Sequence, residues 1–264
     1  MTILKISRYA STICIATAAL ALSPLVGSAL DATQPIKNIV LVHGAFADAT
    51  SWARVIPILE ADGYHVVAVQ NPLTSLSDDV AATRRAIALQ DGPVLLVAHS
   101  WGGVVITQAG NDPKVAGLVY VSAYAPAAGQ SANDASSPYG WTEGQKQIRL
   151  DGGKFATETF QGVSEDIAQR LTLADQKLFF ATQGQSYGPM FDEKVKVAAW
   201  TVKPSWVLIS SNDRMLPPAM ERDEVTKLKA IDTETLPTGH MSIQEEPAKV
   251  AAFIDSAAKH VSSK

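Results

Sequence analysis

The chain has 264 residues, of which 47% are hydrophobic and 18% are charged, so it is long enough to bury one sizeable core. Its formal net charge is −4 at pH 7 and it carries no basic cluster, which argues against a nucleic-acid partner. It has a single cysteine, Cys14, which excludes a framework of intrachain disulfides.

The first 29 residues have the pattern of a secretory signal peptide. Lys5 and Arg8 make the start basic, and an apolar stretch over residues 10–22 follows. That stretch is shorter than the roughly 20 residues that cross a bilayer, which favours a removed signal over an uncleaved membrane anchor. Small residues at 27–29 predict cleavage after Ala29 and export to the periplasm or the medium.

Cleavage would leave a mature chain, residues 30–264, without any thiol. Because Cys14 lies inside the predicted signal, thiolate catalysis and cysteine metal sites are excluded, and the composition suits an oxidising compartment. The signal also carries two positive charges, so its removal changes the formal charge from −4 to −6. We expect no nucleic-acid partner and no stable membrane insertion once the signal is removed.

Short apolar runs alternate with helical patterns in the first half of the mature chain. Strands are predicted over residues 38–42, 65–69, 94–97 and 116–121. Helices are predicted over residues 52–61, from a cap at Ser77 or Asp78 to Gln90, and directly after Ser100. Such alternation is typical of a parallel sheet with helices on both faces.

The alternation stops after Tyr124 and resumes with four further elements. These are a strand over 205–209, a helix over 218–229, a strand over 233–236 and a helix over 246–260. The intervening residues 125–201 show no apolar strand pattern and many aromatic side chains, with helices expected around 164–181. An insertion between strands of one sheet lies at its edge, so we expect a cap over the carboxyl ends of the strands. A functionally silent subdomain is the alternative.

These patterns predict an α/β fold with a doubly wound, mainly parallel sheet and a helical cap inserted between strands. The predicted organisation is a signal peptide over 1–29 and one domain over 30–264, with the cap at 125–201.

Ser100 stands where a buried strand passes into a helix. Ala98 and Gly102, two residues before and two after it, are small. A nucleophile elbow needs that spacing, because the serine takes a strained backbone conformation and bulky flanking groups would collide across the turn. We therefore predict that Ser100 is a nucleophile, although small residues around a serine are common and the motif needs partners.

A serine hydroxyl needs a base to take its proton, and the chain offers five histidines. Four of them flank strands, belong to the elbow or lie near the C-terminus: His43, His65, His99 and His260. His99 is expected to face away from its neighbour Ser100. His240, in a loop after the last strand, is the predicted base, and a solvent-facing loop histidine is the alternative.

Asp213 follows the strand over 205–209 and is predicted to orient His240 and stabilise its charged form. That strand would bring it to the same sheet edge as Ser100 and His240. A turn-forming aspartate or a helix cap is the alternative. The order Ser100, Asp213, His240, each after a strand, is that of the α/β-hydrolase fold.

Attack by Ser100 on a carbonyl would create an oxyanion that needs N–H donors. Trp101, at the start of its helix, is predicted to supply one from its backbone. The second should come from the loop after the first strand, where Ala45 is preferred and Phe46 is the alternative. Gly44 would let this loop pass close to the substrate.

We expect Phe46, Trp101 and Trp141 to contribute to substrate binding. Aromatic side chains beside the nucleophile and in the predicted cap imply a largely apolar pocket, and hence esters or lactones with a hydrophobic portion. The alternative for most of these aromatics is that they form the core of the cap.

The chain resembles the α/β-hydrolase superfamily over essentially all of its mature length. The motifs that carry the resemblance are His43-Gly44-Ala45, Ala98-His99-Ser100-Trp101-Gly102-Gly103, Asn212-Asp213 and Gly239-His240. It is most similar to the small-capped branch that holds plant methylesterases, hydroxynitrile lyases and bacterial pyrethroid-type carboxylesterases. The resemblance implies a cofactor-free enzyme that acts on a small-molecule ester, with the cap forming the acyl or alcohol pocket.

Departures from that branch favour ester hydrolysis. Lyases of the rubber-tree type have a threonine where Gly44 stands and a lysine where Met241 stands, and both groups handle the cyanohydrin. Ser100 also argues against the dehalogenases and epoxide hydrolases of this fold, which use an aspartate nucleophile. A perhydrolase or haloperoxidase-like enzyme, a C–C bond hydrolase or lyase, and a non-enzymatic receptor of hydrolase fold remain alternatives. The sequence has no metal-ligand spacing, phosphate-cradling loop or dinucleotide fingerprint, so neither a metal nor a cofactor is expected.

Overall fold

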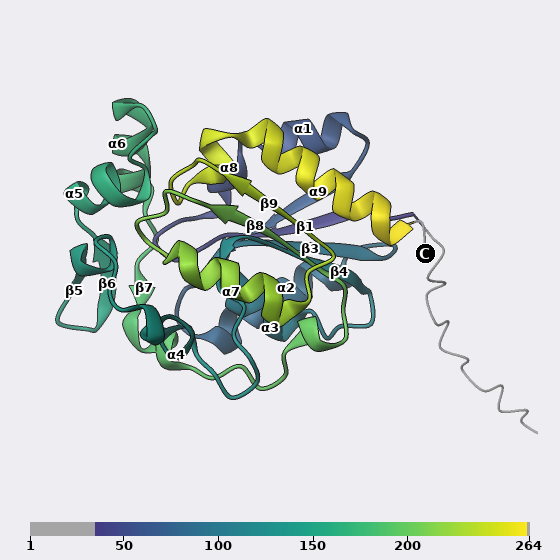
Figure 1. The fold of residues 1–264 in the computed structure, drawn as a ribbon, viewed down its shortest axis with the longest axis horizontal. Helices are drawn as coiled ribbons and strands as arrows, with labels where there is room; N and C mark the ends of the chain where they lie inside the picture. Colours follow the sequence, from purple (N-terminus) through teal and green to yellow (C-terminus); the bar gives the residue numbers. More distant parts are fainter. Residues whose placement is uncertain (1–34, 263–264) are drawn as a thin grey trace, which may run out of the picture.

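A six-stranded sheet forms the centre of the computed structural model, which describes residues 35–262 (Figure 1). The predicted signal peptide therefore lies outside the described residues. The strand order is β2-β1-β3-β4-β8-β9, and every neighbouring pair is parallel. The strands are β1 (Asn38–Val42), β2 (His65–Val69), β3 (Val94–Ser100), β4 (Val115–Ala123), β8 (Ser205–Ser210) and β9 (Asp232–Leu236).

Helices cover both faces of this sheet, which confirms the predicted doubly wound α/β fold (Figure 1). One face carries α1 (Ile56–Ala61), α8 (Ser242–Glu245) and α9 (Pro247–Ser262). The other carries α2 (Leu76–Ala88), α3 (Gly102–Ala109) and α7 (Pro218–Leu228). In the part of the chain that the structure describes, no helix is long and apolar enough to cross a membrane.

The register of the central strands brings the segments that follow β1, β3 and β4 side by side. β1 and β3 are buried along their whole length, as expected for parallel strands with helices on both faces. Val42 of β1 pairs with Ala98 of β3, and Ser100 pairs with Ala123 of β4. The segments that follow β1, β3 and β4 therefore meet at the carboxyl edge of the sheet.

The helix expected over 52–61 is instead two pieces. A short 3₁₀ helix spans Ala49–Trp52, and α1 begins only at Ile56. Pro57 explains the break, because proline has no N–H to give and is tolerated only in the first turn of an α-helix. The side chain of Asp48 caps the 3₁₀ piece by accepting the N–H of Thr50.

Two further helix starts differ from the predicted ones. Ser75, rather than Ser77 or Asp78, caps α2, and its hydroxyl accepts the N–H of Asp78 at 3.0 Å. The helix expected from residue 246 begins at Pro247 and is preceded by the separate short helix α8.

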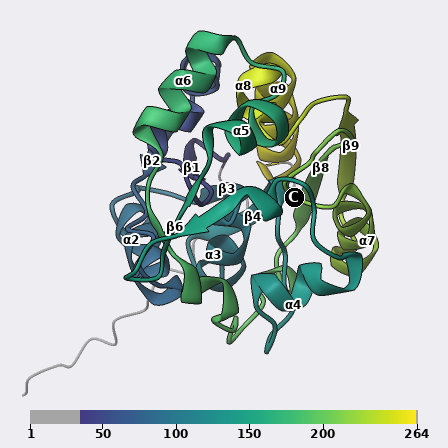
Figure 2. The ribbon, with the colours of Figure 1, turned by 90° about the vertical axis from the view of Figure 1, so that its left-hand side faces the viewer.

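The segment between β4 and β8 forms a layer in front of the carboxyl edge of the sheet, as Figure 2 shows. Its helices are α4 (Ala132–Ser136), α5 (Phe160–Gly162) and α6 (Leu173–Thr182), and a π-helical turn spans Val163–Ile167. Besides the expected helices, this segment holds strands that the sequence pattern did not reveal. It contains an antiparallel sheet of β5 (Ile148–Leu150), β6 (Phe155–Glu158) and β7 (Ser186–Tyr187). These strands are two to four residues long, too short for a hydrophobic pattern to reveal.

Candidate active site

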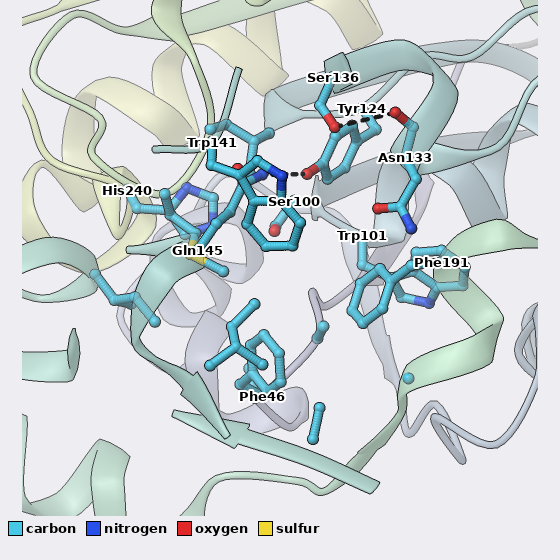
Figure 3. A pocket seen from close by; sticks show the side chains of 18 of the residues that line it. Phe46, Ser100, Trp101, Tyr124, Asn133, Ser136, Trp141, Gln145, Phe191 and His240 are labelled. Carbon is cyan, nitrogen blue, oxygen red and sulfur yellow. Dashed lines mark hydrogen bonds between the residues drawn. The ribbon is translucent and has the colours of Figure 1, made fainter. Parts of the chain in front are cut away.

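Ser100 sits on a strained turn at the end of β3. Its φ is 55°, in the left-handed region that residues other than glycine rarely adopt. Gly102 makes the turn possible, because a Cβ there would lie 2.5 Å from the carbonyl oxygen of Val42. The turn presents the Ser100 side chain to a cavity at the carboxyl edge of the sheet (Figure 3).

His240 and Asp213 reach the same edge from the loops after β9 and β8. Nδ1 of His240 lies 2.6 Å from Oδ2 of Asp213, and both side chains are buried. The other carboxylate oxygen of Asp213 accepts the backbone N–H groups of Met215 and Leu216 at 2.7 and 2.8 Å. Because a carboxylate only accepts, Nδ1 donates this bond, and in a neutral ring the lone pair is then on Nε2.

Ser100 and His240 both line the cavity, but within residues 35–262 no hydrogen bond joins their side chains. A Cβ placed on Gly44 would lie 2.6 Å from Cβ and 3.1 Å from Oγ of Ser100, so the hydroxyl lies close to the loop after β1. A hydroxyl–imidazole bond of this kind often tightens only when substrate is bound. The structure thus joins two of the three predicted groups and places the third in their cavity.

His99 has a role that the sequence did not reveal. Its Nε2 donates to the backbone carbonyl of His240 at 2.8 Å, and the two ring centroids are 4.6 Å apart. Burial first, and the neighbouring His240 second, hold the pKa of His99 well below its usual value. His99 is therefore a neutral support beneath His240.

His43 fixes the loop after β1. Its Nδ1 donates to the carbonyl of Gly44 at 2.8 Å, and its Nε2 accepts the backbone N–H of Asn71 at 3.0 Å. Burial lowers the pKa of His43, so the ring stays neutral and keeps one donor and one acceptor. Gly44 cannot carry a side chain without colliding with Ser100.

Within residues 35–262, some backbone N–H groups near Ser100 are free to bind a substrate oxygen, and one already has an acceptor. In the described chain, no hydrogen bond occupies the N–H of Ala45 or of Trp101. The N–H of Phe46 is instead taken by the hydroxyl of Ser186 in β7, at 3.1 Å. Of the two predicted donors in this loop, Ala45 is therefore available and Phe46 is not.

The cavity has a volume of about 740 Å³. Phe46, Trp101 and Trp141 all line it, as Figure 3 shows. The sequence did not single out its other large apolar lining residues, which include Ile148, Ile167, Phe179, Phe191, Met215 and Leu216. Within the described chain, no group of three or more His, Cys, Asp or Glu residues could hold a metal ion.

The three predicted substrate-binding aromatics have different settings. The ring of Trp101 is fully buried, and its Nε1 donates to Oδ2 of Asp79 at 2.8 Å. It meets Phe191 edge-on, with centroids 5.3 Å apart. Trp141 is 73% exposed, which places it where the cavity opens to solvent. Phe46 adopts a φ of 57°.

Tyr124 adds a polar group to one wall of the cavity (Figure 3). Its hydroxyl accepts from Nε2 of Gln145 at 3.4 Å, and the amide oxygen of Gln145 accepts the N–H of Thr142 at 3.1 Å. Burial raises the pKa of Tyr124 to about 12, so the phenol remains protonated at neutral pH.

Other aromatics of the cap do pack on one another. Phe155 lies 5.3 Å from Tyr187, and Phe160 lies 5.5 Å from Phe180, measured between ring centroids. None of these four lines the cavity and none is buried, with Phe160 37% and Phe180 39% exposed, so the two pairs lie toward the outside of the cap and do not form its core.

Several curated proteins are similar to this chain. "Probable hydrolase R7" of a Phoma species is 32% identical over 163 residues, which cover 53% of this chain and 65% of that protein. Methylesterase 7 of Arabidopsis thaliana is 35% identical over 107 residues, 34% of this chain and 41% of that protein. The pyrethroid hydrolase of Sphingobium wenxiniae is 36% identical over 109 residues, 36% of this chain and 38% of that protein. The chain thus matches less than two thirds of the length of these relatives.

Solved structures show the same fold over most of the chain. Polyneuridine aldehyde esterase superposes with a TM-score of 0.75 at 18% identity, covering 84% of this chain and 99% of that one. A pyrethroid hydrolase superposes with a TM-score of 0.72 at 21% identity, covering 87% of this chain and 100% of that one. The sequence pattern of the alpha/beta hydrolase family matches residues 39–253. The chain therefore belongs to the alpha/beta hydrolase family.

Proposed function

We propose that this protein is a carboxylesterase-type serine hydrolase that cleaves esters or lactones with a hydrophobic portion. The observation that supports it most is the hydrogen bond from His240 to Asp213, because His240 lines the same cavity as Ser100, which stands on a strained turn. Three curated relatives are named methylesterases and one a pyrethroid hydrolase, names that favour ester hydrolysis.

The proposed reaction begins with proton transfer. Nε2 of His240 takes the proton of the Ser100 hydroxyl while Oγ attacks the ester carbonyl carbon. Asp213, whose other carboxylate oxygen accepts two backbone N–H groups, stabilises the imidazolium that results. His240 then protonates the leaving alcohol, and an acyl group remains on Ser100. Water, deprotonated by His240, attacks that acyl group, and Ser100 regains its proton as the acid leaves.

The negative charge that forms on the carbonyl oxygen when Ser100 attacks needs hydrogen-bond donors that are already in position. The N–H groups of Ala45 and Trp101 are the proposed pair: Trp101 follows Ser100, Ala45 follows Gly44, which lies against Ser100, and no other group in the described chain uses either N–H. Trp101 precedes the first residue of α3, where the helix dipole also favours negative charge.

The cavity supports a hydrophobic substrate. Phe46, Phe179 and Phe191 line it together with several aliphatic side chains. A volume of about 740 Å³ suits a molecule larger than a short-chain ester. The phenol of Tyr124 is a polar group that can meet an oxygen of the substrate.

We also propose that the protein is exported, on the strength of the basic start and apolar stretch before Ala29. N-terminal sequencing of material from the periplasm or medium tests this, and a mature protein that begins at Met1 would contradict it.

Hydrolysis by matched variants tests the proposed activity. Ser100→Ala should lose turnover of an activated aryl ester, while Ser51→Ala, which removes another buried hydroxyl, should keep it. Among substrates at equal concentration, aryl and long-chain esters should be hydrolysed faster than esters with a charged acyl group. Wild-type turnover by Ser100→Ala would overturn the mechanism, and a preference for charged esters would overturn the substrate class.

A further inference from the structure

We propose that Ser186, a residue of the cap, is a positioning residue for the oxyanion hole: its hydroxyl holds the 43–47 loop so that the N–H of Ala45 faces Ser100. This inference rests on the proposed acyl-transfer function. It makes the cap part of the catalytic apparatus as well as a wall of the pocket.

The contact that carries the proposal is buried and specific. The backbone N–H of Phe46 donates to Oγ of Ser186 at 3.1 Å. Ser186 is 0% exposed and Phe46 is 2% exposed, so the bond is shielded from solvent. A buried N–H that loses its acceptor is costly, and the loop would rearrange to relieve it.

The backbone of the loop needs such an anchor. Phe46 has a φ of 57°, which is unfavourable for a residue with a Cβ. A strained residue keeps its conformation only when its surroundings hold it there. Ala45 precedes Phe46 directly, so relaxation at Phe46 would turn the Ala45–Phe46 peptide, and the shift of Ala45 that follows would move its own N–H.

Ser186 is itself firmly seated. It pairs with Ala156 of β6, and the N–H of the next residue, Tyr187, donates to the carbonyl of Leu73 at 2.8 Å. Two residues earlier, Gly184 passes so close to the loop that a Cβ there would lie 2.9 Å from the carbonyl oxygen of Ala47. β7 and the residues just before it therefore contact the loop at two points, Phe46 and Ala47.

The loop lies between two fixed points. On one side Gly44 contacts Ser100, and on the other Phe46 is bonded to Ser186. A displacement of β7 would thus change the position of Ala45 relative to Ser100. Even a small displacement of an N–H group that holds the oxyanion lowers the rate of the chemical step more than it changes substrate binding.

Ser186→Ala is the direct test, with Ser131→Ala as its control. Ser131 is also a cap serine with 0% exposure, but its hydroxyl caps α4 by accepting the N–H of Asp134. We expect Ser186→Ala to lower kcat by roughly tenfold or more, with KM within about twofold of wild type. Ser131→Ala should leave both parameters close to wild type.

A ligand that mimics the oxyanion separates positioning from general damage. A trifluoromethyl ketone adds the serine hydroxyl to form an alkoxide in the oxyanion hole, whereas the product alcohol, which has no anionic oxygen, tests the pocket alone. Ser186→Ala should weaken binding of the ketone by about the factor lost in kcat and leave binding of the alcohol unchanged. The inference is overturned if kcat stays within about twofold, if the ketone is unaffected, or if Ser131→Ala shows the same losses.

Two further variants keep the test decisive if Ser186→Ala does not fold. Ser186→Thr retains a hydroxyl and should keep most of kcat, whereas Ser186→Cys offers a weaker acceptor and should lose it. Equal kcat in both would contradict the inference. Activity retained by Ser100→Ala would instead refute the proposed function, so the two failures are distinguishable.

Discussion

The backbone carbonyl of His240 accepts a hydrogen bond from Nε2 of His99 at 2.8 Å, so two neighbouring imidazoles have different tasks. His240 has its own Nδ1 bonded to Asp213, whereas His99 is fully enclosed and stays neutral. A neutral ring beneath His240 supports the loop without opposing the positive charge that His240 would acquire.

Replacing His99 with phenylalanine should lower kcat by roughly tenfold, because the ring remains but the donor to His240 is lost. His99→Gln, which retains an N–H donor, should lose less. Steady-state kinetics on one activated ester measure both. A His99→Phe enzyme with kcat within about twofold of wild type would show that the bond does not matter for catalysis.

Asp213→Asn should reduce kcat by about 10⁴ at neutral pH, the loss seen when this substitution is made in a Ser-His-Asp relay. The amide keeps the shape of the side chain but favours the wrong tautomer of His240. Asp175→Asn, which removes a partly exposed partner of Arg54, is the control and should be nearly silent. A loss of less than about tenfold in Asp213→Asn would contradict the role of Asp213.

Glu158 should make stability depend on pH. Both of its carboxyl oxygens are buried without a hydrogen-bond partner in the described chain, and burial, with Asp166 second, raises its pKa to about 8. The folded state therefore binds a proton that the unfolded state releases near pH 4.5. This contribution to stability is complete below about pH 4.5 and is lost as the pH rises through about 8.

Glu158→Gln should therefore raise the Tm relative to wild type at pH 9 and change it little at pH 5. Thermal unfolding at both pH values tests this. An equal shift at the two pH values would mean that Glu158 does not titrate in the way its burial implies.

Trp101→Phe should destabilise the fold, because it leaves Oδ2 of Asp79 without its indole donor. The expected loss is about 1–3 kcal/mol in the free energy of unfolding. Burial raises the pKa of Asp79 to about 6, and the ionised carboxylate needs the donor more than the protonated carboxyl does. The loss of stability should therefore be larger above pH 6 than below it. Urea unfolding measures it, with Trp141→Phe at an exposed site as the control; equal losses in the two variants would contradict the account.

The sheet and the positions of the proposed triad could be predicted because each depends on local patterns. Apolar runs such as 38–42 and 94–97 mark buried parallel strands, and a parallel sheet brings the residues after its strands to one edge. Ser100, Asp213 and His240 could thus be placed at one edge of the sheet from the sequence.

The cap and its contacts could not be predicted because they depend on tertiary packing. The strands β5 to β7 are too short to carry a pattern, and the bond from Phe46 to Ser186 joins residues 140 positions apart. The different settings of the two histidines could not be predicted for the same reason: His99, a hydrogen-bond donor, and His240, the proposed base, differ in which atoms the fold brings to them.

The most direct test of the central claim is covalent labelling by a fluorophosphonate, which reacts only with an activated serine. Intact-mass analysis and peptide mapping should find one label, on Ser100, formed at a rate that falls by orders of magnitude in Asp213→Asn. A folded wild-type protein that is not labelled, or that carries its label on another residue, would contradict the account.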